Sequence, residues 1–250
     1  MKLPYKQDEI INSLLEVNPN TVVVITAGSP VDMSSWVNNC KALVNVSYNG
    51  MEGGRALAEV LFGDVNPSGK LTVTIPKKLE DSPAHSIGEF PGGEKVRYDE
   101  GIFVGYRYFA TNNVEPQFEF GHGLSYTEFK YDDIRVNVIE EKDEINTEVS
   151  FNLTNICDRK GSEIVQLYMN DVESSSKRPT LELKGFEKVS LLPGESKKVT
   201  IKLDKKAFAF YSEDEKSWIV EPGEFNILVG SSCIKINLEE CINIKSKYKF

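Results

Sequence analysis

The first sixty residues alternate between amphipathic segments and short apolar runs. Residues 7–17 carry apolar side chains at helical spacing, namely Ile10, Ile11, Leu14, Leu15 and Val17. Residues 21–26 form a continuous β-branched run, which predicts a strand covered on both faces in a parallel sheet. A short helix over 32–38, a strand over 42–46 and a helix over 52–62 complete the pattern. Because two strands cannot stand alone in water, we predict an α/β fragment, a partial α/β/α sandwich.

The next segment, residues 76–125, is rich in proline, glycine and aromatic residues. Its aromatic residues include Phe90, Tyr98, Phe103, Tyr106, Tyr108, Phe109, Phe118 and Phe120. Disordered segments are poor in aromatic residues. We therefore predict an ordered connector that packs against another part of a protein.

From about residue 126 the pattern becomes all-β. The predicted strands are 132–139, 145–154, 163–170, 181–190, 197–203, 217–220, 225–230 and 234–238. Residues 145–153 and 197–203 alternate, which places Ile145, Thr147, Val149, Phe151 and Leu153 on one face and Val199, Ile201 and Leu203 on another. Regularly spaced short strands of this kind predict a β-sandwich of the immunoglobulin or fibronectin type III kind. The chain is thus expected to have three parts: an α/β fragment over 1–75, a connector over 76–125 and an all-β sandwich over 126–250.

Composition narrows the classes of function. The chain has 38 acidic and 29 basic residues, with a formal net charge of −9. Nucleic-acid binding needs clustered basic residues, so we expect no nucleic-acid partner. No run reaches the ~18 apolar residues of a membrane span, so no membrane partner is expected. The first ten residues lack the apolar core of a signal peptide, which leads us to expect a cytoplasmic location.

Cysteines and histidines are few. The chain holds Cys40, Cys157, Cys233 and Cys241, and the histidines His85 and His122. They form no CxxC pair, so no zinc site and no other metal or cofactor is expected. We expect free thiols in a reducing compartment, although Cys233 and Cys241 are close enough in sequence for a local bridge.

The turn at residues 48–55 lies between a predicted strand and a predicted helix. The equivalent edge of an α/β sheet is where ligands bind. Its glycines fit neither the GxGxxG nor the P-loop spacing, so we interpret them as permitting a tight turn. Glu52 is either a buried acid or a helix N-terminal residue favoured by the macrodipole, and we prefer the second interpretation.

Four other residues are candidates for chemistry. Asp99 and Glu100 are a candidate carboxylate pair, but neighbours in an extended segment point to opposite sides. Arg107, among tyrosines, is typical of a stacked or ion-paired structural arginine. His122 lies between two glycines without a nucleophile motif such as GxSxG, and is interpreted as a packing or turn residue. The residues alone yield no complete catalytic constellation.

Several runs nevertheless resemble one family, in order and over nearly the whole chain. They are NPNTVVVITAGSPVDM, YNGMEGGRALAEVLFGDVNPSGKLTVTIPK, YDEGIFVGYRYF, FEFGHGLSYTEF, LELKGFEKVSLLPGES and VEPGEFNILVGSS. These runs resemble the second and third domains of family 3 glycoside hydrolases of the β-glucosidase type. The resemblance implies that residues 1–75 are the C-terminal part of the family's α/β sandwich domain. It also implies that residues 126–250 are its fibronectin type III-like domain.

The same resemblance implies how the parent enzyme works. A TIM-like barrel carries an Asp nucleophile and the α/β sandwich carries a Glu acid/base, and retaining hydrolysis uses such a pair about 5 Å apart. In many members the Glu lies in an E-G-x-D-R stretch before a segment ending in L-P. Residues 1–4, MKLP, resemble that segment, so the Glu is expected just upstream of Met1. No position here matches either carboxylate, so no catalytic, cofactor-binding or metal-binding residue is assigned.

The expected function is therefore that of the C-terminal portion of a retaining β-glucosidase-like enzyme, inactive alone. Its parent would act on a β-glucoside or oligosaccharide. Two alternatives stay open. One is a stand-alone carbohydrate- or protein-binding module, and the other is one half of a split enzyme that assembles with a separately encoded TIM-like barrel.

Overall fold

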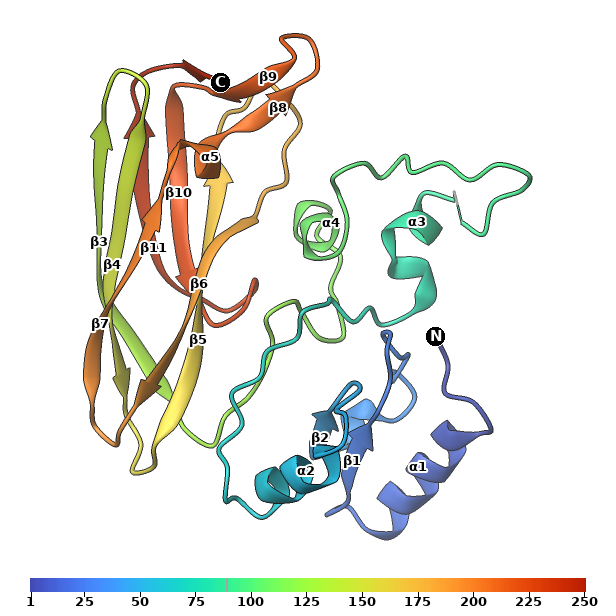
Figure 1. Cartoon of the computed structure of the whole chain (residues 1–250). Helices are drawn as coiled ribbons and strands as arrows, with labels where there is room; N and C mark the ends of the chain where they lie inside the picture. The colour runs from blue at the N-terminus through green and yellow to red at the C-terminus, as the bar shows by residue number, and fades with distance from the viewer. Residues whose placement is uncertain (89) are drawn as a thin grey trace. The chain divides into compact units, whose positions relative to one another are not determined.

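The computed structural model describes residues 1–88 and 90–250, and Figure 1 traces the chain. The described chain divides into two compact units. Unit 1 comprises Met1–Val65 and Thr72–Phe120, and unit 2 comprises Asn66–Leu71 and Gly121–Phe250.

Unit 1 contains a two-stranded parallel sheet with a helix before it and a helix after it. β1 (Val22–Ile25) pairs with β2 (Ala42–Asn45) in parallel. α1 (Gln7–Val17) precedes β1, and α2 (Gly53–Leu61) follows β2. These bounds lie within one residue of the predicted ones at nearly every end. The sheet has only these two strands among the described residues, so the prediction of a partial α/β unit is confirmed.

The helix predicted over 32–38 is largely replaced by turns, and only one 3₁₀ turn forms, η1 (Val37–Asn39). At the start of this segment, Asp32 Oδ1 accepts hydrogen bonds from the Ser34 backbone N–H at 3.0 Å and the Ser34 hydroxyl at 2.6 Å, which forms a local Asx turn. Trp36 then anchors the segment, since it is fully buried and its Nε1 donates to Asp8 at 2.8 Å.

Three short helices form in the described part of the aromatic segment of unit 1. They are η2 (Leu79–Asp81), α3 (Pro83–Ser86) and α4 (Tyr106–Thr111). A single antiparallel bridge joins Ile75 to Phe118, and Tyr106 stacks on Phe120 with ring centroids 4.7 Å apart. Aromatic packing therefore replaces regular secondary structure as the organising element here.

Unit 2 is a β-sandwich of two antiparallel sheets, as predicted. One sheet has the order β3-β4-β7, with β3 (Phe129–Glu140), β4 (Ile145–Asn155) and β7 (Ser196–Leu203). The other has the order β11-β10-β5-β6, with β5 (Gly161–Asp171), β6 (Glu182–Leu191), β10 (Gly223–Gly230) and β11 (Ile236–Ile244). Figure 1 shows β3 and β4 in yellow-green at one side and β10 in orange-red.

A small third sheet lies at one end of the sandwich. Its order is β12-β9-β8, with β8 (Phe210–Ser212), β9 (Ser217–Val220) and β12 (Tyr248–Lys249), and α5 (Lys205–Phe208) precedes it. β8, β12 and α5 were not predicted, because runs of two to four residues carry no readable period.

The core of unit 2 lies between the two large sheets. The predicted inward face of β4 is buried throughout, at Ile145, Thr147, Val149, Phe151 and Leu153. β7 contributes Val199, Ile201 and Leu203 to the same core. Each fully buried aliphatic or aromatic side chain stabilises the fold by about 1.5–3 kcal/mol relative to exposure. The alternate residues of β4 and β7 that the sequence predicts on one face are therefore the residues that build the core of the sandwich.

Candidate functional site

The carboxyl edge of the β1–β2 sheet holds a small hollow of about 130 Å³. It is lined by Ile25, Ala27, Gly28, Ser29, Pro30, Val31, Met33, Asn45, Ser47, Thr72, Val73 and Ile75. None of these side chains is ionisable. The hollow lies where α/β proteins bind ligands. It nevertheless offers neither a general acid nor a nucleophilic carboxylate.

The turn at residues 48–55 leads directly into α2. Gly50 adopts a φ of +70°, in the left-handed region that favours glycine, which agrees with the interpretation of these glycines as turn residues. Glu52 occupies the N-cap position of α2, where its side chain is exposed and makes no capping hydrogen bond. The preferred interpretation of Glu52 as a helix N-terminal residue fits this position.

Asp99 and Glu100 occupy different surroundings. Asp99 is exposed and its Oδ2 lies 3.6 Å from Arg97 Nε. Glu100 is half-buried, and its Oε2 has no hydrogen-bond partner in the described part of the chain. The segment is a turn, closed by the Gly101 N–H donating to the Tyr98 carbonyl at 3.1 Å, and not the extended stretch that was expected.

Arg107 and His122 both sit in packed surroundings. Arg107 lies within α4, half-buried beside the buried Tyr108. The carbonyl of His122 accepts from the Leu71 N–H at 2.7 Å, and Leu71 in turn accepts from the Gly121 N–H at 2.8 Å. These two backbone hydrogen bonds join residues 121–122 to Leu71, which fits the interpretation of His122 as a packing or turn residue.

Residues 66–71, NPSGKL, form a clasp that belongs to the sandwich unit. Lys70 Nζ lies 2.9 Å from Glu163 Oε1 on β5, and both side chains are only 10% exposed. The same ammonium donates to the Gly123 carbonyl at 3.0 Å. A Cβ at Gly123 would lie 2.1 Å from the Gly69 carbonyl oxygen, so the clasp can approach only a glycine.

Asn66 fixes the other end of the clasp. Its Oδ1 accepts from the Ser125 hydroxyl and the Tyr126 N–H, both at 2.8 Å. Its Nδ2 donates to Thr127 Oγ1 at 2.9 Å and to the Lys160 carbonyl at 3.1 Å. In the sequence, this segment was interpreted only as part of a run that resembles family 3 glycoside hydrolases. The available signal in the sequence was an Asn and a Lys within a Pro/Gly turn. Their hydrogen-bond and ion-pair partners lie about 60 and 90 positions away, so no local pattern indicates them.

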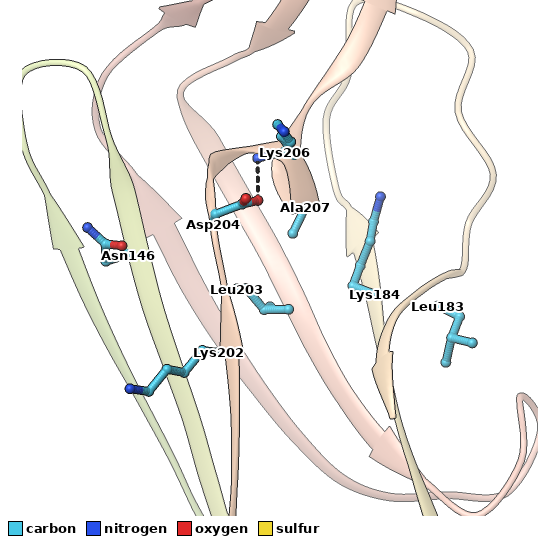
Figure 2. Close-up of a pocket in the computed structure, with 8 residues that line it drawn as sticks. All are labelled: Asn146, Leu183, Lys184, Lys202, Leu203, Asp204, Lys206 and Ala207. Atoms are coloured by element: carbon cyan, nitrogen blue, oxygen red, sulfur yellow. Dashed lines mark hydrogen bonds between the residues drawn. The ribbon is translucent and has the colours of Figure 1, made fainter. Parts of the chain in front are cut away.

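The larger hollow, of about 490 Å³, lies at the edge of the sandwich where β6 and β7 run (Figure 2). It is lined by Asn146, Leu183, Lys184, Lys202, Leu203, Asp204, Lys206 and Ala207. Its single carboxylate, Asp204, caps α5 by accepting from the Lys206 N–H at 2.9 Å, the dashed line in Figure 2. Glycoside hydrolysis needs two carboxylates, so this hollow cannot supply that chemistry.

A buried ion-pair cluster adjoins this edge. Arg178 Nη1 lies 2.8 Å from Asp171 Oδ2, and Arg178 Nη2 lies 2.8 Å from Glu182 Oε2, which Lys184 also approaches. Burial raises the pKa of Asp171, and the Arg178 guanidinium partly offsets that rise. Both acids in this cluster are held by cations, so the cluster is structural.

Metal ligands and disulfides are not found among the described residues. No group of three His, Cys, Asp or Glu side chains in residues 1–88 and 90–250 could hold a metal ion. The four cysteines are free thiols, and the possible bridge between Cys233 and Cys241 is not formed. None of the helices in this part of the chain is long and apolar enough to cross a membrane.

Two protein families match the chain. The glycosyl hydrolase family 3 C-terminal domain matches residues 1–126, and a fibronectin type III-like domain matches residues 163–233. Thermostable β-glucosidase B of Acetivibrio thermocellus is 49% identical over 250 residues, covering 100% of this chain and 33% of the relative. A β-glucosidase of Bacteroides ovatus is 43% identical, covering 92% of this chain and 31% of the relative.

Solved structures of β-glucosidases also match the fold of this chain. The β-glucosidase of Kluyveromyces marxianus in complex with glucose has a TM-score of 0.92 and 41% identity, over 100% of this chain and 30% of that one. β-Glucosidase 3B of Thermotoga neapolitana in complex with glucose has a TM-score of 0.90 and 35% identity, over 100% and 35%. The chain thus spans about a third of the length of these relatives. The resemblance seen in the sequence is confirmed, and the chain belongs to glycosyl hydrolase family 3, corresponding to the C-terminal portion of its β-glucosidases.

Proposed function

We propose that this chain supplies the C-terminal part of a retaining β-glucosidase, whose catalytic carboxylates lie on polypeptide outside this sequence. The observation that carries the proposal is the end-to-end match to the C-terminal third of β-glucosidases, at up to 49% identity. The hollow at the β1–β2 edge has no carboxylate and the one at the sandwich edge has a single carboxylate. We assign no residue of the chain a catalytic role, and we expect no turnover by the chain alone.

The exposed apolar surface of unit 1 supports a role within a larger assembly. Two-stranded sheets are marginal in water. Large apolar side chains stand exposed around this sheet and its helices, among them Val22, Tyr48, Met51 and Phe62. Exposed apolar surface of this extent is typical of a face that another polypeptide covers. The proposed occupant is the remainder of the α/β domain and the TIM-like barrel of the parent enzyme.

A chimeric enzyme tests the proposal. The C-terminal third of the Acetivibrio thermocellus relative is replaced by this chain, and hydrolysis of an aryl β-glucoside is measured. The fusion is expected to hydrolyse the glucoside, whereas this chain alone and the shortened relative alone are expected not to. Turnover by the purified chain alone, or a folded but inactive fusion, would contradict the proposal.

The split-enzyme alternative makes a different prediction for the same two pieces. If the chain assembles with a separately encoded barrel, the shortened relative and this chain should regain activity when mixed as two polypeptides. If only the fusion is active, the two parts must be covalently linked. The parent's substrate class, a β-glucoside or oligosaccharide, is part of the proposal in both cases.

We also propose a cytoplasmic location. The four free thiols support a reducing compartment. Fractionation of the source cells, followed by immunodetection of the chain, tests this proposal, and recovery from the extracellular fraction would contradict it.

A further inference from the structure

Three aromatic side chains line up across the small sheet at the end of the sandwich. Tyr211 on β8 is the direct register partner of Trp218 on β9. Trp218 and Phe250 exchange both backbone hydrogen bonds, at 2.9 and 3.1 Å, so they too lie directly opposite each other. Directly opposed residues of antiparallel strands point to the same face of the sheet. Tyr211, Trp218 and Phe250 therefore form one aromatic row.

The aromatic row is exposed although it continues the core. Two residues away on the same face, the paired Val220 and Tyr248 are buried in the sandwich core. By contrast, Tyr211, Trp218 and Phe250 are 50%, 48% and 36% exposed. Neighbouring strands lie about 4.8 Å apart, so the row spans roughly 10 Å. The buried pair Val220 and Tyr248 therefore anchors the strands that carry the aromatic row, while the three rings of the row are half exposed to solvent.

The rings form a corner and not a flat plate. Tyr211 and Trp218 lie edge to face, with centroids 5.7 Å apart and an interplanar angle of 70°. Lys205 Nζ covers Phe250 at 4.9 Å from the ring centroid. A ligand ring that stacks on Tyr211 or on Trp218 therefore has the second of these two aromatic rings at its edge.

Three lysines around the aromatic row are paired with carboxylates. Glu215, in the β8–β9 turn, lies 2.9 Å from Lys247 Nζ and 3.0 Å from Lys249 Nζ. Lys205 Nζ lies 2.9 Å from Glu144 Oε1. These pairs join the β8–β9 turn to the C-terminal strand, and they compensate the three lysine charges at the rim. Such a rim suits a neutral ligand with many hydroxyl groups.

We propose that the row of Tyr211, Trp218 and Phe250 is a binding site for the sugar rings of a neutral β-glucan or its oligosaccharides. The C–H face of a pyranose is apolar and stacks on an aromatic ring, while its hydroxyl groups reach polar side chains at the edge. Exposed aromatic clusters on otherwise polar surfaces mark interaction sites. The choice of glucan rests on the proposed function, since related β-glucosidases were solved with bound glucose. The site would hold an extended substrate on the sandwich.

Nuclear magnetic resonance of the full chain can locate binding. The chain has two tryptophans, Trp36 and Trp218, and hence two indole N–H signals, which Trp218→Phe distinguishes. Titration with a β-1,4-linked glucose tetramer should shift the Trp218 signal saturably and leave the signal of the buried Trp36 unchanged. Calorimetry should show affinity about tenfold weaker for Trp218→Ala, the loss typical of an aromatic anchor.

Phe186→Ala is the matched control, because Phe186 is 69% exposed on β6 of the same unit and lies outside the row. It should bind the tetramer like the unmodified chain. Urea midpoints of all variants establish that they fold, and the indole titration of the unmodified chain needs no variant. No saturable shift at Trp218, or equal losses in Trp218→Ala and Phe186→Ala, would overturn the proposal. Saturable binding of an apolar peptide and not the glucan would also overturn it.

The active chimera separates this site from the proposed function. There, Trp218→Ala should raise KM for a soluble β-glucan severalfold and leave hydrolysis of the aryl glucoside unchanged. An active chimera whose KM for β-glucan is unaffected would remove the glucan site and leave the β-glucosidase proposal intact. If the chimera is inactive but the chain still binds the tetramer at Trp218, the β-glucosidase proposal fails and the sugar-binding site remains.

Discussion

The clasp offers a sharp test of how the sandwich unit is held together. Lys70 and Glu163 meet at 2.9 Å with side chains 10% exposed, and the Ile164 N–H also donates to Glu163 Oε1 at 2.8 Å. Lys70→Met keeps most of the length of the side chain and removes its charge. The substitution leaves the Glu163 carboxylate buried without its cation.

The expected cost follows from that burial. Removing one partner of a buried ion pair costs about 3–5 kcal/mol, because the remaining charge is desolvated and uncompensated. With an m-value of about 2 kcal/mol per molar urea, the midpoint of unfolding should fall by about 2 M. Lys130→Ala is the control, since Lys130 pairs with Asp132 at 3.3 Å on the exposed surface of the same unit. Exposed pairs contribute about 0–1 kcal/mol, so its midpoint should barely move.

Urea unfolding followed by circular dichroism measures both variants. The double variant Lys70→Met with Glu163→Gln should recover most of the lost stability. Gln keeps the carbonyl acceptor for the Ile164 N–H without the charge. The reasoning is refuted if Lys70→Met costs no more than Lys130→Ala. It is also refuted if the double variant is as unstable as the single one.

Three further predictions concern the same unit. Gly123→Ala should cost about 1–3 kcal/mol by calorimetry, since its Cβ would meet the Gly69 carbonyl, whereas Gly69→Ala, with open space around it, should be nearly neutral. Tyr131→Phe should unfold at higher pH. Burial and the Glu163 charge raise the pKa of Tyr131, so the folded state loses stability as pH rises above about 10, and a pH titration of unfolding would show no difference if this is wrong. A fragment of residues 126–250 should keep the sandwich but unfold at lower urea than residues 66–250, because only the longer one contains the clasp. Equal midpoints, or rapid proteolysis of both, would contradict it.

Local patterns in the sequence determined most of the secondary structure. The β-branched run at 22–25 and the alternation at Ile145–Leu153 both predict strands that form, although β1 is buried only at Val23 and Ile25 and not on both faces. Hydrophobic period and turn residues act over a few positions, so they can be read without knowing the fold. Ordered, specific runs such as NPSGKL also sufficed to indicate the family. The segment at 32–38 departed from its pattern, since it forms turns followed by one 3₁₀ turn.

Tertiary structure alone decided where distant polar groups meet. Lys70 follows a Pro/Gly turn in the sequence, yet it neutralises Glu163, 93 positions away, at the edge of the sandwich core. Likewise, Tyr211, Trp218 and Phe250 become one row only through the pairing of three strands of two to four residues. Strands this short have no period of their own, and ion pairing depends on distance and desolvation, which sequence separation does not encode. The sequence therefore determined the elements and the family, while packing decided which residues form the clasp and the aromatic row.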